Sequence, residues 1–213
     1  MNGFQATVGI TQAWNTFSSD ATSAGALSMY STSNGGGASN AYEGKASYSF
    51  GANDVTGKIW VSGFAQRVNG VRSGETAYSA DIGANLKVAG FDLTGYYYGG
   101  EGTGTTFMLA DGYSTTGYAR DVDGGYVQVK YTLPTKTVAG ISWGQSNLDR
   151  ATGETTTSHA NLVKTNEMWT AGIYHPITKS VNLVAEYSHL TSENQSGQEN
   201  KNNVGSIGGI LFF

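Results

Sequence analysis

Hydrophobic and polar residues alternate along most of this chain, in segments of roughly ten residues. Segment 77–88 shows the pattern most clearly: its even-numbered positions are apolar, as at Ile82 and Leu86, and its odd-numbered positions are small or polar, as at Asp81 and Lys87. Successive side chains of a β-strand point to opposite faces. The pattern therefore predicts strands that separate an apolar surface from a wet one.

The same alternation recurs along the whole chain, and only an isolated residue such as Val184 in segment 180–190 falls on the wrong face. It predicts about ten antiparallel strands in an all-β fold. The expected strands cover residues 3–14, 41–51, 55–67, 77–88, 91–100, 124–133, 137–147, 166–175, 180–190 and 203–213.

The connections between these segments alternate in length. Short links with Gly, Pro, Asn and Asp predict tight hairpins at 51–54, 89–90, 134–136 and 176–179. Ser-, Thr- and Gly-rich links at 15–40, 101–123 and 148–165 are long, and those at 68–76 and 191–202 are intermediate. Short turns at one end and long loops at the other are typical of a bacterial outer-membrane up-and-down β-barrel.

Composition supports strands over helices and narrows the class of protein. The 213 residues include 31 Gly and 13 Tyr but only 2 Pro, and 13% of them are charged. With a net charge of −4 and no basic stripe, a nucleic-acid partner is not expected. The absence of Cys excludes disulfides and thiolate metal sites. Residues 1–20 lack the features of a signal peptide, so we expect an exported protein in mature or truncated form.

The last segment is apolar on one face up to the final residue. Gly205, Ile207, Gly209, Leu211 and Phe213 share that face, which predicts a lipid-facing terminal strand. The alternative is a strand buried in a soluble β-sandwich. Aromatic residues elsewhere favour the membrane, because they are enriched at its two interfaces. The candidates are Tyr131, Trp143, Trp169, Tyr187 and Phe213, with Tyr42, Tyr48 and Phe91 as further members.

Five stretches in the second half of the chain resemble the Gram-negative porin family, and they occur in the family's order. They are RDVDGGYVQVKYT (120–132), GISWGQSNLD (140–149), NEMWTAGIYHPIT (166–178), NLVAEYSHLTSENQSGQ (182–198) and the terminal GGILFF. The resemblance implies an integral outer-membrane channel in contact with lipid and lipopolysaccharide, a homotrimer, and a terminal Phe offered to the barrel-assembly machinery. Family members have about sixteen strands, so residues 1–213 are expected to form one barrel domain, or the C-terminal part of a larger one.

A porin would carry its functional residues on the polar, inward faces of the strands. Rings of charge around a water-filled lumen bias which ions enter. The alternative is that these side chains are solvated wall residues which pair across strands. The pore-lining candidates are Glu43, Lys45, Lys58, Asp81, Lys87, Asp92, Lys130 and Glu186.

The charges in the links predict the sign of any ion preference, because the wall charges nearly balance. Acidic residues outnumber basic ones in the links and at their edges. The acids are Asp20, Glu101, Asp111, Asp121, Asp123, Asp149, Glu154, Glu193 and Glu199, and the bases are Arg72, Arg120, Arg150, Lys164 and Lys201. An acidic mouth raises the local cation concentration, and salt screens this effect. The expected function is therefore passive diffusion of ions and small hydrophilic solutes, with weak cation selectivity.

Catalytic and metal-binding patterns are weak in this sequence. Asp121 and Asp123 resemble half of a calcium loop, but the distal Glu is missing, and an acidic stretch leading into a strand is the simpler interpretation. His159 and Asp149 could serve a protease at the barrel rim, although nothing fixes their geometry. We expect no enzyme activity and no cofactor. A plugged structural or adhesive barrel, whose loops bind an external ligand, is the main alternative to a channel.

Overall fold

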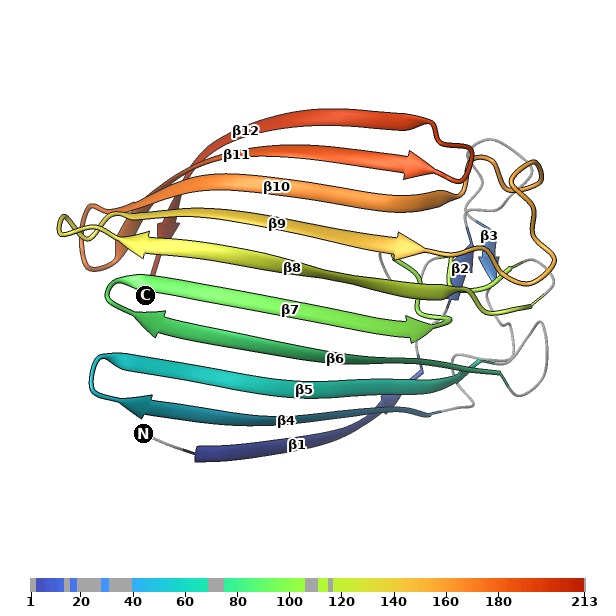
Figure 1. The fold of residues 1–213 in the computed structure, drawn as a ribbon, viewed down its shortest axis with the longest axis horizontal. Helices are drawn as coiled ribbons and strands as arrows, with labels where there is room; N and C mark the ends of the chain where they lie inside the picture. Colours follow the sequence, from blue (N-terminus) through green and yellow to red (C-terminus); the bar gives the residue numbers. More distant parts are fainter. Residues whose placement is uncertain are drawn as a thin grey trace.

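Ten antiparallel strands form one continuous sheet in the computed structural model of this chain (Figure 1). The structure describes residues 3–13, 16–18, 28–30, 40–68, 75–105, 111–114 and 117–212. In chain order the sheet contains β1 (Gly3–Gln12), β4 (Asn40–Ala52), β5 (Val55–Val68), β6 (Glu75–Val88), β7 (Phe91–Glu101), β8 (Asp121–Thr132), β9 (Val138–Leu148), β10 (Val163–Pro176), β11 (Val181–Asn194) and β12 (Glu199–Leu211). The all-β, up-and-down fold predicted from the alternation is confirmed.

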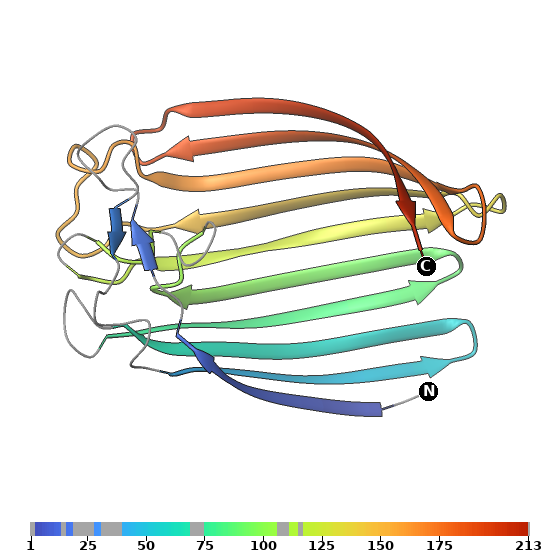
Figure 2. The same ribbon diagram turned by 180° about the vertical axis from the view of Figure 1, so that it is seen from behind.

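A second, two-stranded sheet was not predicted. It consists of β2 (Thr16–Ser18) and β3 (Ser28–Tyr30), within the first long link. Figures 1 and 2 show it at the end of the large sheet where the long loops gather. No helix in the described part of the chain is long and apolar enough to cross a membrane.

The four short turns lie together at the opposite end of the sheet, here called the turn end; the other is the loop end (Figure 2). Tight hairpins need residues with positive φ, and the turn residues supply them. Ala89 has φ 50° and Gly90 has φ 85°, as the type I′ turn between β6 and β7 requires. Asn53 and Lys136 adopt φ 52° and 65° in two other turns.

Some strands extend further toward the loop end than the alternation predicts. The last hairpin, β11–β12, pairs from Val181↔Leu211 to Glu193↔Glu199. The predicted link 191–202 therefore shrinks to a short turn, in which Gly197 has φ 81°. Its polar residues, such as Thr191 and Asn200, show no apolar alternation because both faces are wet at this level. Backbone pairing with a neighbouring strand continues there without a hydrophobic signal.

The two faces of the sheet differ as the pattern predicts. The apolar face is exposed along its length, with Ile82 60% and Ile141 54% exposed, and we call it the outer face. The polar face carries the loop residues that pack against the sheet, and we call it the inner face. The sheet curves, and the C-terminal end of β12 bends furthest (Figure 2). β1 and β12 remain the two edges of the sheet, which is not closed.

The apolar band on the outer face runs obliquely across the strands. On β5 it ends between Ala65 and Arg67, whereas on β11 it ends between Tyr187 and His189. The register pairs of the intervening strands show that this boundary drifts toward the turn end. The drift is about eight residues, or ~26 Å, over six strand spacings of ~4.8 Å, which gives a strand tilt of about 40°. Membrane barrels have strands tilted by a similar angle.

Candidate functional site: the inner face of the sheet

All eight predicted pore-lining residues lie on the inner face. The register places each of them in a row of successive cross-strand partners, and alternate rows face inward. Lys87, Asp92, Lys130 and Glu186 occupy one row near the turn end, and Lys58 lies in the next row. Lys45 and Asp81 share a row nearer the loop end, and Glu43 lies one row beyond them.

Asp92 is the centre of the charge cluster at the turn end. Its Oδ2 lies 3.3 Å from Lys130 Nζ and 3.7 Å from Lys87 Nζ. Asn85 donates a hydrogen bond of 2.6 Å to Oδ1. Two bases therefore share one acid, and the cluster carries a net positive charge. Lys87, Asp92 and Lys130 alternate in sign as direct neighbours in the row, so the charges are not sorted onto opposed walls.

Charges nearer the loop end line a hollow of about 310 Å³ together with Ser62 and Ser79. The Lys45 ammonium lies 5.4 Å from the centroid of the Trp60 ring, within range of a cation–π contact. Ser62 donates a hydrogen bond to Asp81. In the turn-end row, the Tyr174 hydroxyl donates to Glu186. Each of these carboxylates is held by a neighbouring strand, which fixes its position in the wall.

The link between β7 and β8 folds onto the inner face at the loop end. Tyr113, only 4% exposed, packs against Val68 of β5 and Ala77 of β6, with Ala119 beside them. Tyr113 also pairs with Ala119 through an isolated β-bridge. Burial raises the pKa of the Tyr113 hydroxyl, and the nearby Glu75 and Glu101 carboxylates add to the effect. The sequence gives little sign of this contact, because a single Tyr in a Gly-rich link resembles an exposed loop residue.

The link between β9 and β10 covers the adjoining part of the inner face. Leu162 packs against Leu148 and Val122, and Tyr98 of β7 borders this cluster. Gln195, in the β11–β12 turn, ties a third connection to it: its side chain donates to the Leu148 carbonyl and its backbone N–H to the Leu162 carbonyl, both over 2.8 Å. Three connections are thus joined over the loop end of the inner face.

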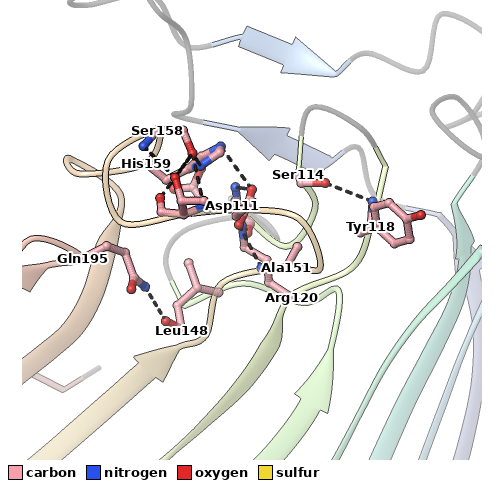
Figure 3. Close-up of polar contacts among 11 residues, drawn as sticks. Asp111, Ser114, Tyr118, Arg120, Leu148, Ala151, Ser158, His159 and Gln195 are labelled. Carbon is pink, nitrogen blue, oxygen red and sulfur yellow. Dashed lines mark hydrogen bonds and ion pairs between the residues drawn. The ribbon is translucent and has the colours of Figure 1, made fainter.

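A buried ion pair holds the first two of these links together (Figure 3). Arg120 is fully buried, and its Nε donates to Glu154 Oε2 over 3.0 Å, with a second bond from Nη2 to Oε1. Arg120 Nη1 also donates to the Asp111 carbonyl over 2.8 Å. Burial opposes ionisation of Glu154, but hydrogen bonds from Arg120 and from the Ala151 N–H outweigh it and lower the pKa of Glu154.

The structure changes the charge balance that the sequence predicts for the links at the loop end. Arg120 and Glu154 neutralise each other out of contact with water, so neither contributes to a field at the mouth. Lys164 Nζ lies 2.9 Å from Glu193 Oε1, and Lys201 Nζ lies 2.6 Å from Glu199 Oε2, so these charges also form pairs. The register also places Asp123, Glu193, Glu199 and Lys201 on the outer face. Asp20 and Arg72 lie outside the described residues.

The predicted interface aromatics lie on the outer face, and most of them mark the oblique edge of the apolar band. Trp143 and Trp169 are register partners, and the next outer residues toward the loops are Gln145 and Glu167. Tyr187 packs against Trp169 with ring centroids 5.4 Å apart. Nearer the turn end, the rings of Tyr131 and Phe91 have centroids 4.7 Å apart. Phe213 lies outside the described residues.

The weak metal candidate lies at the start of β8, where the sequence pattern predicts a loop. Asp121 and Asp123 share the outer face, and Asp123 Oδ2 accepts a hydrogen bond of 3.2 Å from Asn147. Among the described residues, no group of three or more His, Cys, Asp or Glu side chains could hold a metal ion. Two carboxylates alone do not supply the six to eight oxygens that calcium prefers.

His159, the candidate base of a rim protease, belongs to the loop scaffold. Its Nε2 lies 3.3 Å from Glu154 Oε1, and its Nδ1 lies 2.7 Å from the Ser158 hydroxyl (Figure 3). The Glu154 carboxylate is already engaged by Arg120, and the Ser158 hydroxyl donates to the Thr155 carbonyl. These contacts stabilise a tight loop.

Comparison with solved structures gives the fold a known counterpart. The crystal structure of the outer membrane channel DcaP of Acinetobacter baumannii is similar to this chain, with a TM-score of 0.73 and 15% sequence identity. The match covers 98% of this chain and 59% of that chain, so this chain spans about three fifths of the length of the protein it resembles. No protein-family model and no curated protein matches the sequence.

Proposed function

We propose that this chain forms an outer-membrane channel, or part of one, for the passive diffusion of ions and small hydrophilic solutes. The observation that carries the proposal is the division of the ten-stranded sheet into an apolar outer face and a charged, hydroxyl-rich inner face. Such a sheet is stable in a bilayer only if its inner face surrounds water or packed side chains. Similarity in fold to an outer membrane channel supports the same function and the same location.

The two edges of the sheet must be paired in the membrane, because an open edge leaves backbone groups without hydrogen bonds in hydrocarbon. β1 and β12 are the first and last of ten alternating strands, so they run in opposite directions. They can pair with each other, or an even number of further strands can separate them. A barrel of about ten strands is largely filled by its own side chains, whereas one of about sixteen holds a water channel.

Conductance across a planar bilayer tests this proposal. A channel of fixed geometry gives stepwise, ohmic conductance in salt solution. A barrel that inserts into the bilayer, with a circular-dichroism spectrum typical of β-structure, but never conducts would contradict the proposal. That result would favour a plugged or adhesive barrel, which the three connections joined over the inner face make the relevant alternative.

We further propose weak cation selectivity. The inner wall carries four acids and four bases, and among the residues at the loop-end tips of β7, β8 and β9 the acids Glu101, Asp121 and Asp149 outnumber Arg150, with Glu101 and Asp121 on the outer side of the rim. Rim fields of this kind are screened beyond ~10 Å at 0.1 M salt. The reversal potential across a salt gradient should therefore show a cation preference that increases as salt is lowered. An anion preference at low salt would mean that the turn-end cluster around Asp92 dominates.

The remaining part of the proposal is a homotrimer in contact with lipopolysaccharide. Its terminal strand would be the signal that the barrel-assembly machinery recognises. Small residues on the outer face of the last strands, at Ala185, Gly205 and Gly209, permit close contact between neighbouring barrels. Chemical cross-linking in mild detergent should give a trimeric mass. A monomeric mass that cross-linking leaves unchanged would contradict this assembly.

A further inference from the structure

One row of the inner face is apolar and aromatic, although the rows on both sides of it are polar. Successive register partners form this row across β5 to β11, and we call it the aromatic row. Its members are Trp60, Gly83, Tyr96, Tyr126, Gly144, Met168 and Leu190. Apolar side chains on the wet face of a sheet are not needed to hold it in lipid, so this row calls for another explanation.

The side chains of the aromatic row follow one another across the wall and form a strip. The rings of Tyr96 and Tyr126 have centroids 5.6 Å apart and planes inclined by 35°. Trp60 lies over Gly83, where a Cβ atom would come within 2.0 Å of the indole ring. Glycine therefore lets the large ring lie flat against the next strand. Tyr126 is 40% exposed and Met168 45%, so the strip presents apolar surface to the lumen.

The two flanking rows carry hydroxyls and amides along the β8–β11 part of the strip. On the loop side they are Ser146, Asn166 and Ser192, and on the turn side Gln128, Ser142, Thr170 and Ser188. Together with Tyr126, Met168 and Leu190, residues of both rows line a hollow of about 790 Å³. The charged inner residues Lys130 and Glu186 lie one row further toward the turn end. The two rows that flank the strip from β8 to β11 therefore carry no charge, and Glu167 and Lys201, which also border the hollow, occupy outer-face positions.

We propose that the aromatic row is a binding track for neutral pyranose sugars, an inference that rests on the proposed channel function and specifies its solute. A pyranose ring has apolar C–H faces, which stack on aromatic and aliphatic side chains. Its edge carries hydroxyls, which both donate and accept hydrogen bonds. An apolar strip between two rows of hydroxyls and amides matches both features. From β8 to β11 a charged solute finds no ionic partner in the flanking rows, whereas Lys58 and Asp81 lie beside Trp60 and Gly83 at the other end of the strip. A purely apolar solute makes no use of the hydroxyls and amides in these rows.

The strand tilt turns this row into a path along the channel. At Trp60 the row lies well inside the apolar band of the outer face, whose edge on β5 is near Ala65. At Leu190 it has passed beyond the edge, which lies between Tyr187 and His189 on β11. The strip thus climbs from the membrane interior toward the loop end. A sugar can move along it by exchanging one ring contact for the next.

Current reduction by maltotriose in a planar bilayer tests the track. We expect added maltotriose to reduce the ohmic current with a saturable dissociation constant, and the open-chain polyol sorbitol to reduce it without saturation. Tyr126→Ala should raise the dissociation constant for maltotriose roughly three- to tenfold, the effect of losing one ring contact. Tyr126→Phe keeps the ring and should stay within about twofold of the parent protein. Tyr97→Ala, which removes an aromatic residue from the outer face, is the matched control and should change nothing.

The outcomes separate the track from the channel. The track is overturned if ohmic steps occur but maltotriose has no saturable effect on them, or if its dissociation constant is the same in Tyr126→Ala as in the parent protein. Neither result contradicts the channel. Absence of conductance overturns the channel. In that case calorimetric titration of maltotriose into the folded, detergent-solubilised barrel still decides the track. Heat of binding that disappears in Tyr126→Ala but not in Tyr97→Ala supports it, and absence of heat from the parent protein overturns it.

Discussion

The guanidinium of Arg120 and the carboxylate of Glu154 form a bidentate ion pair from which water is excluded, with side-chain exposures of 0% and 3%. The pair joins the link that follows β7 to the link that follows β9, and both links lie over the inner face. Exposed ion pairs contribute little to stability, whereas removing one partner of a buried pair leaves a charge without compensation. This contact therefore joins the two links where they cover the inner face of the sheet.

Replacing Glu154 should release the links without unfolding the barrel. Glu154→Gln removes the carboxylate that the buried Arg120 guanidinium binds, at a cost of about 3–5 kcal/mol to the docked arrangement. We expect limited proteolysis to cut within 111–120 and 149–162 far faster than in the parent protein, while the β spectrum is unchanged. Glu193→Gln breaks the exposed pair with Lys164 and is the control, with an effect of ~1 kcal/mol or less. Equal cleavage rates in the two variants would show that other contacts hold the links.

Acidification should release the same links, and the direction follows from the pKa of Glu154. Its pKa is lower in the folded protein than in the unfolded chain, so the pair is fully stabilising above the usual carboxylate pKa. The stabilisation is lost as pH falls through the folded value. Protease sensitivity of the links, followed with an acid-active protease, should therefore stay low from pH 7 to about pH 5 and rise below about pH 4. A rise already near pH 6 would show that ionisation of Glu154 does not control the docking of the links.

Asp92 should control the sign of the charge at the turn end. Asp92→Asn removes the acid that Lys87 and Lys130 share and leaves two bases on the inner face. We expect the reversal potential to shift toward anions, and the shift to be larger at low salt because screening is weaker. Asp54→Asn, in the first turn, removes the same charge away from this row. A shift of equal size in that control would attribute the effect to net charge alone.

Gly83 should tolerate no larger residue while Trp60 remains in place. The added methyl of Gly83→Ala would meet the indole at 2.0 Å, and displacing the ring costs about 1–3 kcal/mol. Gly95→Ala is the matched control, because a Cβ atom there meets nothing within 4 Å. Urea unfolding in detergent, monitored by tryptophan fluorescence, compares the two variants. Equal midpoints would show that the indole moves away freely.

Adjacent residues on β9 should respond differently to a positive charge. Ile141 lies on the outer face within the apolar band, and Ser142 faces inward. A lysine on the lipid face of a barrel costs about 2–4 kcal/mol near the bilayer midplane, while the inner face tolerates it. Ile141→Lys should therefore lower the yield of folded barrel in vesicles more than Ser142→Lys. The opposite order would mean that the two faces have been assigned the wrong way round.

The fold could be read from the sequence because each strand carries its own signal. A period of two in hydrophobicity assigns every side chain to a face, as at Ile82 and Asp81, and turn residues such as Ala89-Gly90 mark the hairpins. The eight pore-lining candidates were placed on one face for the same reason. Strand ends were less well predicted, because the wet, Ser- and Asn-rich end of the last hairpin lacks an apolar face.

Features that depend on neighbouring strands were decided only by tertiary structure. The sequence by itself shows that Tyr96 and Tyr126 belong to strands, but only the register makes them partners in one row. Likewise Arg120 and Glu154 are separated by a whole hairpin, and nothing in the local pattern of either link predicts that the two charges meet. Alternation is a local property that sets which face a residue occupies. Which residues share that face at the same level depends on strand register, and a shift of one pair rearranges every contact across the sheet.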